Sequence, residues 1–239
     1  MLVEAIRKGD GATSLNLARA DGNNEANWRD IPGPKEMEKA LEEIVLSGYR
    51  DMFKAKTLEE AFLAFGSFRI LCAHREGPYG VYAVNQMVEK ILSDKGLIQG
   101  GVWFKGRPIM TVSNDYDLRL FNGDIGLSWV DEENSPGDMA LYFPSEDGNE
   151  MRRIEPGRLP GHETVFAMTL HKSQGSEFDR VLILLGNERS RVMTRELVYT
   201  GISRAKKSVE IWSDEDTFRD TVAEPAKHGG CGLLSKIIG

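Results

Sequence analysis

Cysteine is scarce in this sequence, which excludes two common ways of stabilising a fold. Only Cys72 and Cys231 occur among the 239 residues, too few for a disulfide framework or a four-ligand zinc site. Cys72 lies in a short apolar run and is predicted to be a buried strand residue, whereas Cys231 is predicted to be a thiol of the C-terminal tail. This cysteine usage fits a protein of the reducing cytoplasm.

Long apolar runs are also missing. No stretch approaches the ~18 apolar residues needed to span a membrane, and the N-terminus lacks the apolar core of ~7–15 residues that a signal peptide requires. The content of 41% hydrophobic and 28% charged residues is ordinary for a soluble globular protein. We therefore expect no membrane partner and a cytoplasmic location.

Positive charge is in deficit, because the formal net charge is −7. This excess of acid argues against non-specific nucleic-acid binding by the chain as a whole. The segment 164–212 is the exception, since it holds eight Lys and Arg residues against five acidic ones. A basic segment in an acidic protein suggests a local anionic partner, although a solvated charged face is a common alternative.

Residues 1–66 read as helical and carry no recognisable chemistry. Apolar residues recur at helical spacing in 35–53, and 57–66 begins with a Thr57–Glu60 capping-box pattern. The segments 9–15 and 20–34 are rich in Gly, Asn, Asp and Pro and are predicted to be loops.

The rest of the chain predicts an α/β fold with an insertion. A buried strand at 68–73 precedes an amphipathic helix that ends at Gly96, and alternating strands and a helix return after residue 164. This alternation predicts a mostly parallel sheet with helices on both faces. Between them, four short strand-like runs separated by turns predict a small antiparallel β-barrel at 107–163. The expected division of the chain is thus 1–66, 67–106, 107–163, 164–224 and a tail, 225–239.

Three polar stretches are candidates for chemistry. Thr169–Phe178 (TLHKSQGSEF) combines hydroxyl, imidazole and ammonium groups that could hold phosphates, with Gly175 permitting close backbone approach. Arg204 follows a predicted helix, and Arg75 follows the first predicted strand. Taken singly, each has a structural alternative: a solvated turn, a helix-terminal arginine that favours the last carbonyls, and a surface loop arginine.

Together these stretches resemble a known family. HKSQGSEFD followed by VLILL and VYTGISRAK resembles the last two conserved motifs of superfamily 1 helicases. With FRILCAHREGPYGV and LFNGDIG, the pattern is similar to the C-terminal region of the RecD family, the alpha subunits of exodeoxyribonuclease V. The resemblance covers roughly residues 65–212 well, fits the helical lead-in less specifically, and hardly extends past Glu224.

The resemblance implies a RecA-like second motor domain, interrupted by a barrel similar to Src-homology-3 domains, with 1–66 leading in from the preceding motor domain. It implies that Arg204 and Arg75 act as arginine fingers on the γ-phosphate of ATP. The implied nucleotide contacts are Glu177, at the sugar, with Gln174 and Gly175 beside it. The implied contacts to single-stranded DNA are Thr169, His171, Lys172 and Ser173. Asn122, in LFNGDIG, is as readily a turn residue as a DNA contact.

One departure from a complete motor is plain. The phosphate-binding P-loop is absent, since the sequence contains no Gly-Lys dipeptide. Nor does a magnesium-binding acid stand at a strand end, because the acids of LSWVDEE (127–133) fall in the β-rich insertion and are predicted to belong to a hairpin. The chain therefore looks cut from a longer one, although Met1 could be a native start.

The expected function is that of the C-terminal part of an ATP-dependent DNA helicase subunit acting in double-strand-break repair and recombination. The implied partners are RecB-like and RecC-like subunits, single-stranded DNA and a P-loop domain, with ATP and Mg²⁺ required only where that domain is present. Two alternatives stay open: a non-enzymatic module that binds DNA or protein, and a part of a stand-alone RecD-like helicase. No carboxylate cluster indicates a metal or nuclease site.

Overall fold

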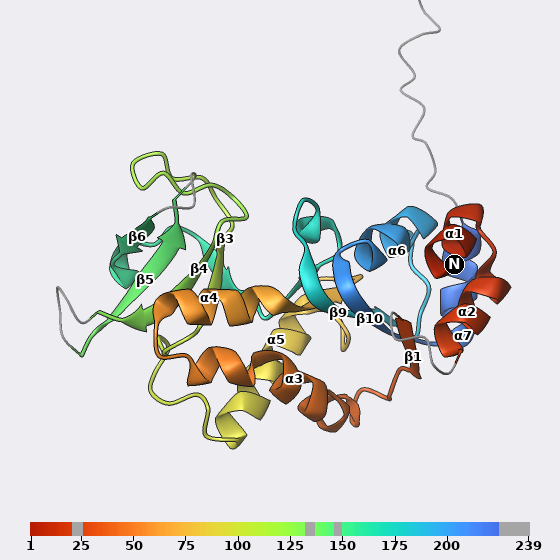
Figure 1. Cartoon of the computed structure of the whole chain (residues 1–239), viewed down its shortest axis with the longest axis horizontal. Coiled ribbons are helices and arrows are strands. Elements are labelled where there is room, and N and C mark those ends of the chain that lie inside the picture. Colours follow the sequence, from red (N-terminus) through yellow and green to blue (C-terminus); the bar gives the residue numbers. More distant parts are fainter. Residues whose placement is uncertain (21–25, 132–136, 146–149, 225–239) are drawn as a thin grey trace, which may run out of the picture.

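The computed structural model describes residues 1–20, 26–131, 137–145 and 150–224. It contains two five-stranded sheets, one parallel and one antiparallel. The antiparallel sheet lies at one end of the molecule, and the parallel sheet with most of its helices lies at the other (Figure 1). Cys231 and the predicted tail, 225–239, lie outside the described residues.

The parallel sheet has the strand order β1-β10-β9-β2-β8. Its strands are β1 (Ala26–Asp30), β2 (Phe68–Cys72), β8 (Ala167–Thr169), β9 (Phe178–Gly186) and β10 (Ala205–Ser213). β2 is buried along its whole length and β9 over its last six residues, because they are inner strands covered on both faces. The predicted α/β class with a parallel sheet is confirmed.

Seven α-helices occur among the described residues. They are α1 (Leu2–Lys8), α2 (Gly11–Arg19), α3 (Met37–Lys54), α4 (Leu58–Ser67), α5 (Val81–Asp94), α6 (Arg195–Ile202) and α7 (Glu215–Ala223). The predicted capping box of α4 is present, since the Thr57 side chain and Glu60 satisfy each other's backbone nitrogens. The 9–15 loop prediction was wrong, because Asp10 caps α2 by accepting from the Thr13 nitrogen and the helix begins at Gly11.

The helices cover both faces of the parallel sheet. Tyr49 of α3 contacts the Phe68 ring edge-to-face, with the ring centroids 5.1 Å apart. On α6, a Cβ added at Gly201 would lie 3.0 Å from the Ile183 side chain, so the helix approaches the sheet closely there. Phe68 pairs in register with Arg180, three residues before Ile183, and side chains alternate along a strand. α3 and α6 therefore lie on opposite faces.

The loop prediction for residues 20–34 was also wrong in part. The segment was expected to be a loop, but residues 26–30 form β1, which pairs in parallel with β10 from Ala26↔Val209 to Asp30↔Ser213. The N-terminal part of the chain thus contributes to the same sheet as residues 178–213. β1 is an edge strand with exposed polar side chains, which explains why its sequence has loop-like composition.

The antiparallel sheet is formed within the predicted insertion and has the order β6-β5-β4-β3-β7. Its strands are β3 (Pro108–Thr111), β4 (Ile125–Val130), β5 (Met139–Pro144), β6 (Met151–Ile154) and β7 (His162–Thr164). Four strands were expected, and β7 is the additional one. Among the described residues no pairing joins β6 to β7, so a closed barrel stays a prediction.

Candidate functional site

The segment Thr169–Phe178 runs back along the parallel sheet, from the carboxyl end of β8 to the amino end of β9. Thr169 is level with Cys72 and Leu184, whereas Phe178 pairs with Ala205 at the start of β10. The six residue steps from Phe178 to Leu184 correspond to roughly 20 Å, since a strand rises about 3.3 Å per residue. The predicted site residues therefore lie at opposite ends of the parallel strands. We call the end where the strands finish the carboxyl edge of the sheet and the end where they begin the amino edge.

At the carboxyl edge, one carboxylate joins two cations from different parts of the chain. Glu163 of β7 accepts a hydrogen bond from Arg75 (Nη2–Oε2, 2.7 Å) and another from Lys172 (Nζ–Oε1, 2.9 Å). Arg75 also donates to the Tyr82 hydroxyl at 2.6 Å. That hydrogen bond and the nearby Glu163 charge raise the pKa of the Arg75 guanidinium, so it is fully charged. We call Arg75, Glu163 and Lys172 the carboxyl-edge triad.

The hydroxyl and imidazole groups around this triad differ in their exposure. His171 is exposed. Thr169 is half-buried, and its hydroxyl accepts a hydrogen bond from the backbone nitrogen of Lys172 at 3.3 Å. Ser173 is fully buried, and its hydroxyl donates to the Leu170 carbonyl at 2.7 Å. The Ser173 hydroxyl is thus enclosed in the protein and occupied by a backbone acceptor in this conformation, and its predicted contact with DNA stays a prediction.

At the amino edge, Arg204 is held by the end of α6 and by the loop before β9. Its guanidinium donates to the Ser176 carbonyl (3.0 Å), the Thr200 carbonyl (3.2 Å) and the Ser203 hydroxyl (3.1 Å). Within the part of the chain that the structure describes, no carboxylate forms an ion pair with it. The contact with Thr200 is the helix-terminal role considered above, so the free chain uses Arg204 structurally while leaving its charge uncompensated.

The other predicted nucleotide contacts belong to the same edge. Gln174, Gly175 and Glu177 are exposed, and Glu177 forms an ion pair with Lys206 at 3.3 Å. Gly175 has a φ of 86°, which favours glycine at this turn. The Phe178 nitrogen donates to the Arg204 carbonyl at 2.8 Å, which fixes this loop beside the arginine.

Two predicted residues are thus not brought together. Arg75 follows the carboxyl end of β2, whereas Arg204 precedes the amino end of β10. An arginine side chain cannot span the length of the sheet between them, so both cannot contact one phosphate from these positions. Asn122 lies in a turn where its backbone nitrogen donates to the Asn114 side chain at 2.8 Å, Gly123 has a φ of 101°, and the Gly123 nitrogen donates to the Thr111 carbonyl at 2.9 Å.

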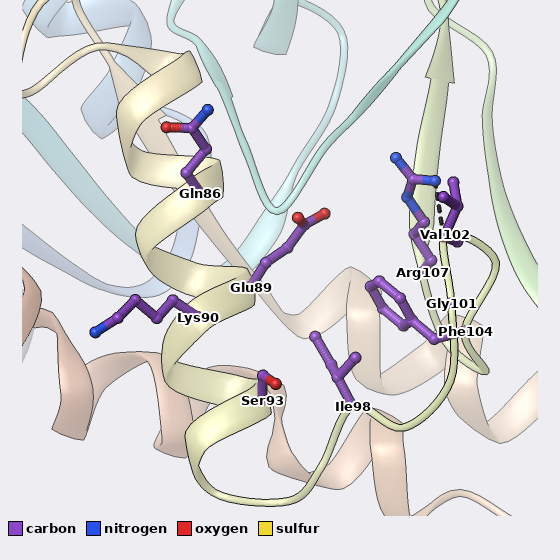
Figure 2. A pocket seen from close by; sticks show the side chains of 9 residues that line it. All are labelled: Gln86, Glu89, Lys90, Ser93, Ile98, Gly101, Val102, Phe104 and Arg107. Carbon is purple, nitrogen blue, oxygen red and sulfur yellow. Dashed lines mark hydrogen bonds between the residues drawn. The ribbon is translucent and has the colours of Figure 1, made fainter.

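A groove of about 490 Å³ lies between α5 and the segment 98–107. Figure 2 shows Glu89 pointing into it from α5, with Arg107 on the opposite wall and hydrogen-bonded to the Val102 carbonyl. Burial lowers the pKa of Arg107. The groove contains none of the predicted site residues, so the volume of a groove does not identify the functional site in this protein.

The hairpin prediction for 127–133 is confirmed over its described part, because β4 and β5 pair antiparallel. Asp131 is buried and accepts from Arg153 at 2.7 Å, as expected for a structural acid; residues 132 and 133 lie outside the described residues. Within the described ranges, no group of three or more His, Cys, Asp or Glu side chains could hold a metal ion, and no helix is long and apolar enough to cross a membrane.

Three residues that contribute to the candidate site were not predicted from the sequence. Tyr82 and Glu163 are partners of Arg75, and Glu163 is 88 positions away from it in the chain. Asn85 sits among the apolar residues of α5, where its side chain accepts from the Ala167 nitrogen and donates to the Ala167 carbonyl. The position of Asn85 on the apolar face of a helix could have indicated its role from the sequence. No local sequence pattern indicates the role of Glu163.

Comparison with known proteins gives this geometry a context. Residues 164–211, which supply most of both edges, match the UvrD-like helicase C-terminal domain. The chain is 37% identical over 234 residues to RecBCD enzyme subunit RecD of Mycobacterium tuberculosis, covering 94% of this chain and 38% of the relative. It is 29% identical over 178 residues to the ATP-dependent RecD2 DNA helicase of Deinococcus radiodurans, covering 72% of this chain and 24% of the relative.

Among solved structures, the Bacteroides Pif1 helicase in complex with ADP-AlF3 and single-stranded DNA aligns with a TM-score of 0.43 at 15% identity, covering 87% of this chain and 47% of that one. The parts of the two edges that lie within residues 164–211 are thus similar to a UvrD-like helicase C-terminal domain. More particularly, the chain is a homologue of RecD over nearly its whole length, which confirms the predicted resemblance. It spans about two fifths of the length of the mycobacterial RecD relatives.

Proposed function

We propose that this chain is the second half of a RecD-like, ATP-dependent DNA helicase motor, supplying an arginine finger and part of the DNA track. In this proposal residues 67–106 and 164–224 form a RecA-like unit that β1 completes, with 1–66 leading in from the preceding motor domain. Residues 107–163 form the Src-homology-3-like insertion. The parent would act in double-strand-break repair and recombination with RecB-like and RecC-like subunits.

The observation that carries the proposal is the state of Arg204. Its guanidinium is oriented by three hydrogen bonds, yet no carboxylate among the described residues neutralises it. A fixed, uncompensated guanidinium is what stabilises the charge that develops during phosphoryl transfer. Glu177, exposed on the adjoining loop, is suited to accept a sugar hydroxyl, with Gln174 and Gly175 bordering it. These residues fit ATP as a substrate whose phosphates another domain holds.

The carboxyl edge supports the DNA part of the proposal. Lys172 and exposed His171 supply donors to backbone phosphates, and Thr169 supplies a hydroxyl. Because Arg75 shares its anionic partner with Lys172 and lies far from Arg204, we assign Arg75 to the DNA side rather than to a second finger. Such contacts bind without reading sequence.

The test uses two preparations. The 239-residue chain should bind labelled oligo(dT) in a salt-dependent manner and should not hydrolyse ATP, because the sequence has no P-loop. Joined to a RecD-type P-loop domain, it should support DNA-stimulated hydrolysis that Arg204→Ala abolishes while nucleotide binding persists. Hydrolysis by the chain alone, or unchanged turnover in Arg204→Ala, would contradict the proposal.

A stand-alone helicase parent is the second candidate. The similarity to the RecD2 helicase of Deinococcus radiodurans favours it. Co-purification decides between the two, since only the first candidate predicts stable RecB-like and RecC-like partners.

A further inference from the structure

The carboxyl-edge triad contains an acid where the proposed function needs only cations. Glu163 is 15% exposed and Lys172 26% exposed, whereas Arg75 is 44% exposed. The carboxylate therefore lies deepest, between two cations that reach it from β2's loop and from the segment after β8. Each carboxylate oxygen takes one of them, at 2.7 and 2.9 Å.

The backbone of Glu163 is held in the sheet, so only its side chain has to move when another anion takes the place of the carboxylate. Glu163 pairs with Met110 in the β3–β7 ladder. On the next residue, the Thr164 hydroxyl accepts from Arg107 Nε and Nη2, at 3.2 and 2.9 Å. Replacing the carboxylate by another anion then needs only a rotamer change of Glu163, without displacement of the strand.

A DNA phosphodiester matches this carboxylate in two respects. Both carry a single negative charge, and both present two equivalent oxygen atoms that accept from two donors. Arginine in particular binds carboxylates and phosphates with the same planar geometry. Two cations around one carboxylate leave one net positive charge at the triad, and removal of the carboxylate charge would leave two.

We propose that Arg75 and Lys172 form one phosphodiester-binding site whose resident occupant is the Glu163 carboxylate, which a backbone phosphate of single-stranded DNA displaces. This inference rests on the proposed function, because it assumes that the carboxyl edge faces DNA. It assigns Glu163 the role of weakening the binding of single-stranded DNA, because each phosphate is bound only in exchange for an intramolecular ion pair. A motor that must release DNA at each step gains from such a contact.

The decisive variant is Glu163→Gln in the 239-residue chain, with binding of labelled oligo(dT) measured by fluorescence anisotropy over a range of salt concentrations. Glutamine keeps the size of the side chain and removes its charge. The affinity should rise several-fold, because the phosphate no longer competes with the carboxylate for the two cations.

The matched control is Glu76→Gln, which removes an equal charge from an exposed residue next to Arg75. In the part of the chain that the structure describes, Glu76 forms no ion pair, so its variant should bind like the wild type. In an Arg75→Ala/Lys172→Ala background, Glu163→Gln should no longer have any effect. If Glu163→Gln does not fold, Glu163→Asp replaces it: the shortened acid cannot hold both cations and should give a smaller gain in affinity.

The outcomes separate the inference from the function beneath it. Absence of binding by the wild type and by Glu163→Gln alike refutes the DNA role of this edge, and the inference with it. Binding that depends on Lys172 but is indifferent to Glu163→Gln, or an equal gain from Glu76→Gln, overturns only the inference. A gain confined to Glu163 variants and dependent on the two cations supports it.

Discussion

The side-chain amide of Asn85 in α5 forms two hydrogen bonds with the backbone of Ala167 in β8. Its oxygen accepts from the Ala167 nitrogen at 2.9 Å, and its nitrogen donates to the Ala167 carbonyl at 3.0 Å. β8 is an edge strand of only three residues. Asn85 therefore replaces a missing neighbouring strand and fixes the backbone that leads into Thr169 and Lys172.

Asn85→Ala should destabilise the protein. It leaves the buried Ala167 nitrogen and carbonyl without this partner, and each unsatisfied buried polar group costs about 1–3 kcal/mol. Urea denaturation should show a free energy of unfolding lower by at least ~1 kcal/mol. Gln86→Ala, one residue along on the exposed side of α5, is the control and should change it by less than about 0.5 kcal/mol. Equal effects of the two variants would show that Asn85 has no special role.

Arg204→Ala should separate nucleotide binding from hydrolysis in a protein that joins this chain to a P-loop domain. Arginine fingers contribute about 10³–10⁵ in rate in other nucleotidases, so turnover should fall by that order while nucleotide affinity changes little. Arg204→Lys should not restore turnover, because an ammonium lacks the planar fork. Lys207→Ala removes an exposed cation from the same edge and should leave turnover intact; a comparable loss there would point to a general charge effect.

Lys172→Ala should weaken binding of single-stranded DNA uniformly across sequences. Loss of one phosphate contact lowers the magnitude of the salt slope by about 0.7. Titrations with oligo(dT) and oligo(dA) check both statements, and Lys95→Ala, at the far end of α5, is a control of equal charge. A sequence-dependent loss would indicate contact with bases instead.

Arg75→Ala distinguishes a DNA contact from a second arginine finger. We expect it to raise the DNA concentration needed for half-maximal ATPase activity while leaving turnover at saturating DNA nearly unchanged, because Arg75 lies with Lys172 and far from Arg204. Steady-state kinetics of the joined protein supply both parameters. Turnover reduced at saturating DNA, with half-saturation unchanged, would restore the finger role.

Cys72 should be chemically silent in the folded protein. Its side chain is fully buried in β2, and burial raises the pKa of its thiol well above the usual range. In a Cys231→Ser variant, a thiol-reactive chromophore should therefore react only when urea unfolds the protein, since the thiolate is the nucleophile. Rapid labelling under native conditions would show that the strand opens locally.

Strands and helices with a strong period were predictable from the sequence. The apolar run of β2 and the amphipathic pattern of α5 each depend on local spacing, and the structure has both elements close to the predicted bounds. The motif residues at the two edges were identified differently, by the resemblance of their order along the chain to a known helicase family.

Contacts between distant residues were not predictable. β1 has a polar sequence, and its only strand partner, β10, lies near the other end of the described chain. α7 was missed although Asp214 caps it by accepting from the Thr217 nitrogen at 3.0 Å. The burial of Ser173 and the two ion pairs of Glu163 depend on how the segment after β8 folds back over the sheet, which no local pattern encodes.

The pairing of β1 with β10 also constrains how the protein can be made. During synthesis β1 leaves the ribosome long before β10, so the first strand waits, unpaired, for nearly the whole length of the described chain. Contacts between distant residues form late because closing a long loop is costly in entropy. The pairing of β1 with β10 is thus among the last to form, and until β10 is in place both β1 and β9 have an edge that is open to other chains.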